Sequence, residues 1–228
     1  MTTPGKKFIV VGGGIGGLAA AVALSQQGVH VTVLEQAAQL GEIGAGVQLG
    51  PNAFAALDAL GVGETARKRA VFTERLIMMD AVDGSEVGSF PVGQAFRDRF
   101  QNTYAVIHRA DIHTSMLEAT QGSNLIQVET STKVVSVSQD DQGVTAVDQN
   151  GRIFKADALV AADGVRSVIR EKLFNDPPRI SGHVVYRAVV PVAEMPLDLQ
   201  INAPVVWAGP DCHLVHYPLR DGQQYNLV

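Results

Sequence analysis

The sequence predicts an α/β protein whose first part is a Rossmann-like βαβ unit with a parallel sheet, followed by a partial antiparallel β domain. Residues 8–11 form a short, wholly apolar run, as expected for a strand covered on both faces. Residues 18–27 are rich in alanine and end at Gly28, which predicts a helix. Residues 29–34 are a second β-branched run. A strand, a helix and a strand within about thirty residues indicate two parallel strands joined by the helix.

The middle of the chain continues with shorter predicted elements. A helix is expected over 53–60, capped by Asn52 and ended by Gly61, and a hairpin is expected over 75–90 with its turn at Asp83-Gly84. The other expected elements are a strand at 104–108, a helix at 111–120, short strands at 125–128, 133–138, 144–148 and 152–154, an apolar strand at 158–162, and a helix that ends at Phe174.

The chain changes character after Pro177-Pro178, where we expect a domain boundary. Residues 183–190, 205–208, 213–217 and 224–228 are typical of strands with no helix between them, which predicts an antiparallel sheet. The last of these strands is apolar and is followed by no polar tail or cap. Because an unpaired apolar strand is unfavourable, we expect this sheet to be truncated.

Composition and charge exclude several classes of protein. The formal net charge is -5, so nucleic acid is not an expected partner. The single cysteine, Cys212, excludes an intrachain disulfide and fits a reducing compartment. Residues 8–24 carry no charge, but the glycines among them break an apolar helix and favour a turn. We therefore expect a cytoplasmic protein with no signal peptide and no integral membrane segment.

The glycine cluster is the first motif that carries chemistry. Gly12, Gly14 and Gly17 have the spacing Gly-x-Gly-x-x-Gly, follow a strand and open a helix, and the next strand ends in Glu35. In such a unit the glycines allow a tight turn and let a pyrophosphate approach the N–H groups of the helix N-terminus. Glu35 can accept hydrogen bonds from a ribose diol. This context favours dinucleotide binding over a glycine-rich turn without a ligand.

Three further features lie at the ends of predicted strands. Residues 41–52 contain closely spaced glycines, which suit either the approach of a flat ring to the backbone or a flexible connector. Asp163 can bond sugar or ribityl hydroxyls, although the dipeptide Asp163-Gly164 is also common in turns. Arg109 could bind a phosphate through two hydrogen bonds or form a surface salt bridge. The spacing of the histidines indicates no metal site.

A resemblance to a known family rests on these motifs and their order. They are Val11-Gly-Gly-Gly-Ile-Gly-Gly17, Gly44-Ala-Gly-Val47 followed by Pro51-Asn-Ala53, His108-Arg-Ala-Asp111, and Ala162-Asp-Gly-Val-Arg-Ser167. Together they resemble the single-component FAD-dependent aromatic hydroxylases, the flavoprotein monooxygenases that include the 4-hydroxybenzoate and salicylate hydroxylases. The resemblance covers nearly the whole chain and is to the N-terminal part of such proteins. A further fingerprint of the family, a Gly-Asp dipeptide, does not occur in this sequence, which agrees with truncation.

The resemblance implies a contact for each part of FAD. Gly12, Gly14 and Gly17 would hold the pyrophosphate, Glu35 would hold the adenosine ribose, and Val135 would contact the adenine. Arg109 would reach the ribityl or phosphate region, and Gly46, Val47 and Gln48 would lie near the isoalloxazine. Asp163 would contact FAD and help to bind NAD(P)H. It also implies a discontinuous FAD-binding domain over 1–73 and 101–177, a hairpin insertion at 74–100, and a partial substrate-binding sheet at 178–228.

The substrate is expected to meet the strand at 213–217. Electrophilic hydroxylation is faster on a phenolate than on a phenol, so a general base or a hydrogen-bond relay should face the substrate hydroxyl. On a strand, His213 and Tyr217 share one face, and a histidine titrates near neutrality, as a base should. We interpret this pair as the catalytic relay, in agreement with the resemblance. The alternative is two polar residues on a solvated face of the sheet.

The resemblance implies a monooxygenase that consumes O2 and NAD(P)H, with NADH favoured. In this family reduced flavin reacts with O2 to give a C4a-hydroperoxide, which transfers one oxygen atom to an activated phenol. The expected partner is a small aromatic substrate, a phenolic acid such as 3-hydroxybenzoate, which would become gentisate. The alternatives are another flavin-dependent oxidoreductase or an epoxidase on the same fold, and an FAD-binding fragment without catalysis. The oligomeric state is open, with a homodimer as one candidate.

Overall fold

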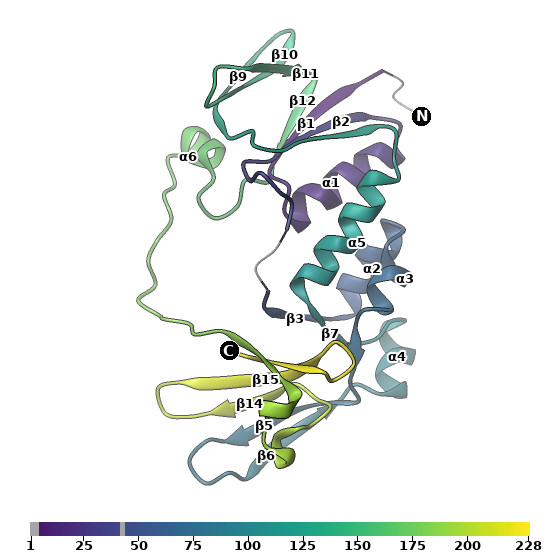
Figure 1. The fold of residues 1–228 in the computed structure, drawn as a ribbon, viewed down its shortest axis with the longest axis vertical. Coiled ribbons are helices and arrows are strands. Elements are labelled where there is room, and N and C mark those ends of the chain that lie inside the picture. The colour runs from purple at the N-terminus through teal and green to yellow at the C-terminus, as the bar shows by residue number, and fades with distance from the viewer. Residues whose placement is uncertain (1–4, 42–43) are drawn as a thin grey trace. The chain divides into compact units, whose positions relative to one another are not determined.

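A computed structural model describes residues 5–41 and 44–228 of the protein (Figure 1). Its packing divides the chain into two compact units. The first unit comprises Met1–Glu42 and His113–Gly182, and the second comprises Ile43–Ile112 and His183–Val228. The chain therefore passes from the first unit to the second and back again before it ends in the second.

The first unit is built on a four-stranded sheet whose neighbours are all parallel. Its strands are β1 (Lys7–Val11), β2 (His30–Leu34), β8 (Ile126–Glu129) and β12 (Ala158–Ala161), in the order β12-β1-β2-β8. Helix α1 (Ile15–Gln26) connects β1 to β2, which confirms the predicted βαβ unit. The helix forms because its sequence is rich in alanine and leucine, and it ends where Gly28 takes a φ of +76°.

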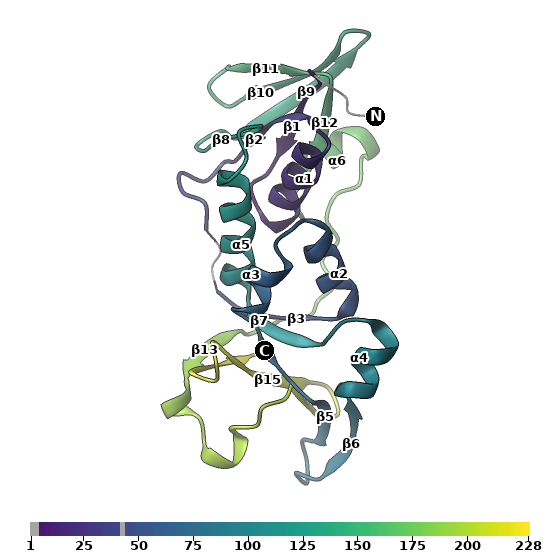
Figure 2. The same cartoon turned by 90° about the vertical axis from the view of Figure 1, so that its right-hand side faces the viewer.

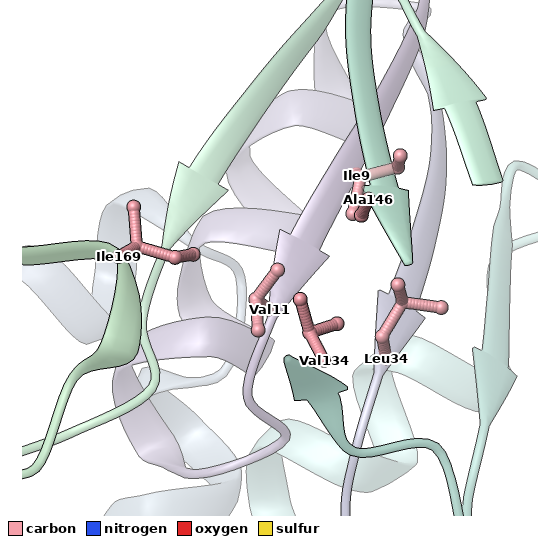
Figure 3. Packing of buried hydrophobic residues seen from close by; sticks show 6 residues of the cluster. All are labelled: Ile9, Val11, Leu34, Val134, Ala146 and Ile169. Carbon is pink, nitrogen blue, oxygen red and sulfur yellow. The ribbon is translucent and has the colours of Figure 1, made fainter. Parts of the chain in front are cut away.

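Two layers cover this parallel sheet. Helix α1 packs on one face, and the sheet of β9 (Val134–Asp140), β10 (Gly143–Asp148) and β11 (Ile153–Ala156) covers the other (Figure 2). Helix α5 (Arg109–Gln121) begins in the second unit and continues into the first, and α6 (Val168–Phe174) follows β12. Figure 3 shows the buried core of this unit, which consists of Ile9, Val11, Leu34, Val134 and Ala146 from the two sheets and Ile169 from α6.

The second unit contains a mixed six-stranded sheet. Its strands, in spatial order, are β13 (Ala188–Pro191), β16 (Gln224–Leu227), β15 (His213–Leu219), β14 (Val205–Ala208), β5 (Arg75–Asp80) and β6 (Glu86–Pro91). The hairpin predicted at 75–90 is confirmed as β5–β6. It joins the C-terminal strands through β14, and this β14–β5 pair is parallel whereas the other pairs are antiparallel (Figure 1).

A smaller sheet of β3 (Gly46–Leu49), β7 (Ala105–His108) and β4 (Val71–Phe72) completes the strands of the second unit. It packs on the six-stranded sheet, because Val71 and Val106 contact Val215, Tyr217 and Leu219. Helices α2 (Pro51–Ala59), α3 (Gly63–Arg67) and α4 (Gln94–Phe100) belong to the same unit. This apolar contact packs β4 and β7 with the second unit, while the FAD-binding domain predicted over 1–73 and 101–177 stays a prediction.

The structure differs from the expectation for residues 183–190. Only β13 at Ala188–Pro191 is a strand, and two short 3-10 helices, Val192–Glu194 and Leu197–Leu199, lie before β14. The prediction of a strand from residue 183 was therefore wrong, as was the absence of helical turns. Val184, Val185 and Tyr186 are apolar but remain exposed and pair with no strand among the described residues. Their composition favours a strand, yet a strand forms only where a neighbour accepts its hydrogen bonds.

None of the helices in the described segments is both long and apolar enough to span a bilayer.

Candidate functional site

The turn from β1 to α1 excludes side chains at two of the predicted glycines. Gly12 has a φ of +106°, and a Cβ there would overlap the carbonyl oxygen of Ala162 in the turn after β12. A Cβ at Gly17 would overlap the carbonyl oxygen of Gly12, so α1 can approach the strand only with glycine at this position. Gly14 is the N-cap of α1 and no side chain caps the helix. The first N–H groups of α1 are therefore available for an anion.

Glu35 lies directly after β2 and is tied to the same turn. Its Oε2 accepts a hydrogen bond from the backbone N–H of Gly13 at 2.6 Å, and its Oε1 accepts one from the N–H of Ala37 at 2.7 Å. His113, buried on α5, contributes a contact that the sequence analysis missed, because its Nε2 lies 2.8 Å from the carbonyl oxygen of Gly13. Both polar groups of Gly13 are thus held by side chains, and no local sequence pattern marks His113 for this role.

Three of the predicted residues line one cavity of about 320 Å³ in the first unit, a size that suits part of a nucleotide ligand. They are Gly12, Glu35 and Asp163. The rest of the lining combines apolar residues with two cationic ones, and it consists of Val11, Leu34, Gln36, Thr132, Lys133, Val134, Arg166 and Val168. The glycine turn, the carboxylates and the cations therefore line a single hollow.

Asp163 and Val135 occupy different positions with respect to this cavity. The Oδ1 of Asp163 accepts a hydrogen bond from the Ser167 hydroxyl at 2.6 Å, and Ser167 in turn caps α6 by accepting from the N–H of Arg170. This arrangement fixes the Asp163 carboxylate at the cavity wall. Val135, by contrast, is 45% exposed on β9, and its neighbour Val134 lines the cavity instead. A contact from Val135 to adenine stays a prediction.

In the second unit, β3 carries the residues predicted to lie near the isoalloxazine. Gly46, Val47 and Gln48 pair with β7, and Gly46 lies opposite His108. The Gln48 carboxamide oxygen accepts a hydrogen bond from the hydroxyl of Tyr104. Glu42 and Ile43, which belong to the glycine-rich segment singled out in the sequence, lie outside the described residues.

Arg109 and its neighbours hold the beginning of β3. The N–H of Arg109 donates to the carbonyl oxygen of Ala45 at 2.9 Å. The imidazole of His108 fills the space beside Gly44, where a Cβ would overlap the ring. Burial and, to a smaller extent, the Arg220 guanidinium lower the pKa of His108, which favours the neutral imidazole. The side chain of Arg109 is exposed, so its role toward a phosphate or a ribityl chain stays a prediction.

Tyr217 is buried on β15 and lies against β3. A Cβ at Gly46 would be 2.8 Å from the Tyr217 Oη and would overlap the edge of the ring, so the ring occupies the space that glycine leaves. The N–H of Gly46 donates to the Oδ1 of Asn226 at 2.6 Å, a contact that sequence reasoning missed. Burial raises the pKa of Tyr217 to about 12, against the opposing effect of the Arg187 guanidinium. The phenol is therefore neutral near pH 7.

His213 begins β15 and is exposed, whereas Tyr217 lies near the buried end of the same strand. Four residues along a strand span about 13 Å, so the two side chains share a face without bonding each other directly. They can meet a bound molecule at two separate points. Among the described residues, no three His, Cys, Asp or Glu side chains are grouped so as to hold a metal ion.

Comparisons with known proteins show a close similarity in sequence. The chain is 60% identical over 222 residues to 3-hydroxybenzoate 6-hydroxylase of Klebsiella oxytoca and 58% identical over 220 residues to that of Polaromonas naphthalenivorans. These matches cover 97% and 96% of this chain but 56% and 55% of the relatives, so the chain spans about half of their length.

Solved structures show the same fold. HpxO of Klebsiella pneumoniae, solved with FAD and uric acid, matches with a TM-score of 0.84 at 27% identity and covers 99% of this chain and 57% of its own. The 2,6-dihydroxypyridine-3-hydroxylase of Arthrobacter nicotinovorans matches with a TM-score of 0.81 at 27% identity, over 97% of this chain and 55% of its own. The FAD-binding domain family matches residues 6–207, and the chain therefore belongs to that family.

Proposed function

We propose that the protein is an FAD-dependent monooxygenase that uses NAD(P)H and O2 to hydroxylate a phenolic aromatic acid such as 3-hydroxybenzoate. One observation carries the proposal, the 60% identity to 3-hydroxybenzoate 6-hydroxylase over 97% of the chain. A match of this extent leaves only a few residues outside it. The glycine turn and the β15 face therefore both lie within the matched region, which supports a common cofactor and a common substrate class.

The first unit supplies the groups that would hold the adenosine diphosphate of FAD. Gly12, Gly14 and Gly17 keep the start of α1 free of side chains, and its unpaired N–H groups suit a diphosphate. Glu35 would accept hydrogen bonds from the ribose hydroxyls with the lone pairs that its two backbone contacts leave free. Asp163, at the wall of the same cavity, would bind hydroxyls of the cofactor. Bound FAD would supply the redox chemistry that links NAD(P)H to O2.

The second unit supplies the groups that would face the isoalloxazine and the substrate. The backbone of Gly46 and Val47 would lie beside the flavin ring, with the Tyr217 ring packed against Gly46 on the side of its missing Cβ. His213 would remove the proton from the substrate hydroxyl, since a phenolate ring is more reactive toward an electrophile than a phenol ring. Tyr217, with a pKa of about 12, would stay protonated and donate a hydrogen bond rather than act as the base. A preference for NADH over NADPH, a homodimer and a cytoplasmic location stay predictions.

Purification of the full chain with a panel of aromatic acids tests this function. We expect a yellow protein whose NADH oxidation is stimulated by 3-hydroxybenzoate, with gentisate formed in step and identified by chromatography. Uric acid, 4-hydroxybenzoate and salicylate serve as competing substrates. A hydroxylated product from one of these alone would replace the substrate but keep the reaction class. A colourless protein that ignores added FAD would reject the proposal and favour an incomplete fragment.

A further inference from the structure

Asn226 occupies an unusual place for a carboxamide. It lies in β16, and no part of the residue is exposed. Its partner across the antiparallel pair is Tyr217, so the two side chains lie next to each other on the same face of the six-stranded sheet. Asparagine is depleted in strand interiors, and the run around it, Tyr225-Asn-Leu-Val228, is otherwise apolar or aromatic.

Within residues 5–41 and 44–228, the carboxamide of Asn226 makes one hydrogen bond, and that bond reaches β3. Its Oδ1 accepts the hydrogen bond from the backbone N–H of Gly46 at 2.6 Å, and both residues are buried. Tyr217 holds the same glycine through its ring, which fills the space of the missing Cβ. Gly46 is therefore held by two neighbouring side chains of one sheet, one through a hydrogen bond and the other through packing.

The second polar atom of Asn226 weighs against a role in packing alone. Its Nδ2 is buried and has no hydrogen-bond partner among the described residues. An unpaired buried donor costs free energy, and an apolar residue of the same shape would avoid that cost. Leucine could fill the volume and pack in the same sheet, but it could not accept the hydrogen bond from Gly46. The geometry therefore favours a role for the carboxamide oxygen that packing alone does not serve.

We propose that Asn226 is a positioning residue that sets the height of β3 above the six-stranded sheet. This inference rests on the proposed function, because it gives the fixed position of Gly46 and Val47 a purpose beside the flavin ring. Without the hydrogen bond, the N–H of Gly46 would be left unpaired in a buried place, and the start of β3 would move to satisfy it. Small displacements of reacting groups reduce rates strongly, so a shifted β3 would separate flavin chemistry from attack on the substrate.

The test compares Asn226→Leu with Asn226→Asp in the full chain. Leucine conserves the volume and removes the acceptor, whereas the neutral aspartic acid that burial favours keeps a carbonyl oxygen for the Gly46 N–H. We expect Asn226→Leu to speed amide hydrogen exchange in a peptide covering 44–49 by about tenfold, since loss of one buried hydrogen bond opens the segment more often. Exchange in 7–11 should not change. Asn226→Asp should stay close to the wild type in the 44–49 peptide.

Asn202→Ala provides the matched control. The Asn202 side chain donates to the carbonyl oxygen of Phe72 at 3.2 Å in the same unit, but it is exposed and bonds β4 rather than β3. This variant should leave exchange at 44–49 unchanged. A second readout is the share of consumed NADH that appears as hydrogen peroxide rather than hydroxylated product, which we expect to rise several-fold in Asn226→Leu alone while the FAD affinity changes little.

The outcomes separate the two proposals. Unchanged exchange at 44–49 in a folded Asn226→Leu protein overturns the positioning role, whether or not the wild type hydroxylates an aromatic acid. Faster exchange in a protein that binds no FAD supports the positioning role and rejects the proposed function. If Asn226→Leu does not fold, Asn226→Asp provides the test. Exchange at 44–49 as slow as in the wild type would support the side-chain oxygen as the essential group, and fast exchange at 44–49 would overturn the positioning role.

Discussion

The glycine turn of the first unit and the start of β3 in the second unit hold a backbone segment by different means. In the turn, the N–H of Gly13 is bound by Glu35, which lies 22 positions later within the same βαβ unit. At β3, the N–H of Gly46 is bound by Asn226, which lies 180 positions later. The first arrangement follows from a local pattern, and the second exists only once the sheet has formed. The proposed nucleotide site is therefore more visible in the sequence than the proposed substrate site.

The largest expected effect is at Gly17. Gly17→Ala should lower the free energy of unfolding by about 3 kcal/mol and abolish FAD binding, because the new Cβ would overlap the carbonyl oxygen of Gly12 and push α1 away from the turn. Urea unfolding and fluorescence titration with FAD measure the two effects. Gly16→Ala is the matched control for stability, since Gly16 is exposed in the same helix with nothing near its Cβ, and it should gain about 0.5 kcal/mol. Equal stability of the two variants would show that α1 does not pack closely on the turn.

A smaller effect is expected at the exposed end of β15. His213→Ala should slow hydroxylation by about 100-fold, or about 2.7 kcal/mol in activation free energy, and leave flavin reduction by NADH nearly unchanged. Stopped-flow absorbance separates the two half-reactions. Tyr217→Phe is the companion variant, because it removes a phenol that stays protonated and cannot serve as the base. If His213→Ala slowed both half-reactions equally, the residue would not act on the substrate hydroxyl.

The elements that could be predicted from the sequence are those that short sequence patterns specify. The run at 8–11, the glycine spacing and Glu35 predicted the parallel pair β1–β2, and the structure brings Gly12, Glu35 and Asp163 to one cavity. Asp163 lies far along the chain, but it follows a strand of the same parallel sheet, and the ends of parallel strands meet at one edge. The topology of the parallel sheet therefore made the position of this distant residue predictable.

The rest depended on contacts that no short pattern records. Residues 184–186 have the composition of a strand but pair with no strand in the described part of the chain. The sheet of β3, β7 and β4 joins the second unit because Val71 and Val106 pack against the β15 face. Asn226 gave one signal, a polar residue inside an apolar strand, but its partner could not be inferred. Burial of His216 likewise follows from the pairing of β15 with β14 and β16, since alternation alone places it only on the face opposite Tyr217.

The next prediction concerns the packing of Tyr217 against Gly46 in β3. Gly46→Ala should lower the free energy of unfolding by about 2 kcal/mol, because its Cβ would overlap the edge of the buried Tyr217 ring. Gly88→Ala in β6 is the matched control within the same unit, since it is exposed and its Cβ would meet nothing within 4 Å. Thermal or urea unfolding of both variants measures the difference. A Gly46→Ala protein as stable as Gly88→Ala would mean that β3 does not lie against Tyr217, and the comparison with the glycine turn would fail.

The smallest expected effect concerns pH and the opposite face of β15. His216 is buried between Trp207 and Tyr225, its Nε2 has no hydrogen-bond partner among the described residues, and burial lowers its pKa. Below the unfolded-state pKa of about 6.5 the unfolded chain binds the proton more readily than the folded one, so stability should fall as the pH drops below that value. One group of this kind changes the free energy of unfolding by at most about 1.4 kcal/mol per pH unit. His216→Phe should therefore reduce the change in the free energy of unfolding between pH 7.5 and 5.5, measured by urea unfolding. His30→Gln, which removes a histidine exposed at the start of β2, serves as the control. An unchanged slope in His216→Phe would place His216 in contact with water and would contradict the packing of this face of the sheet.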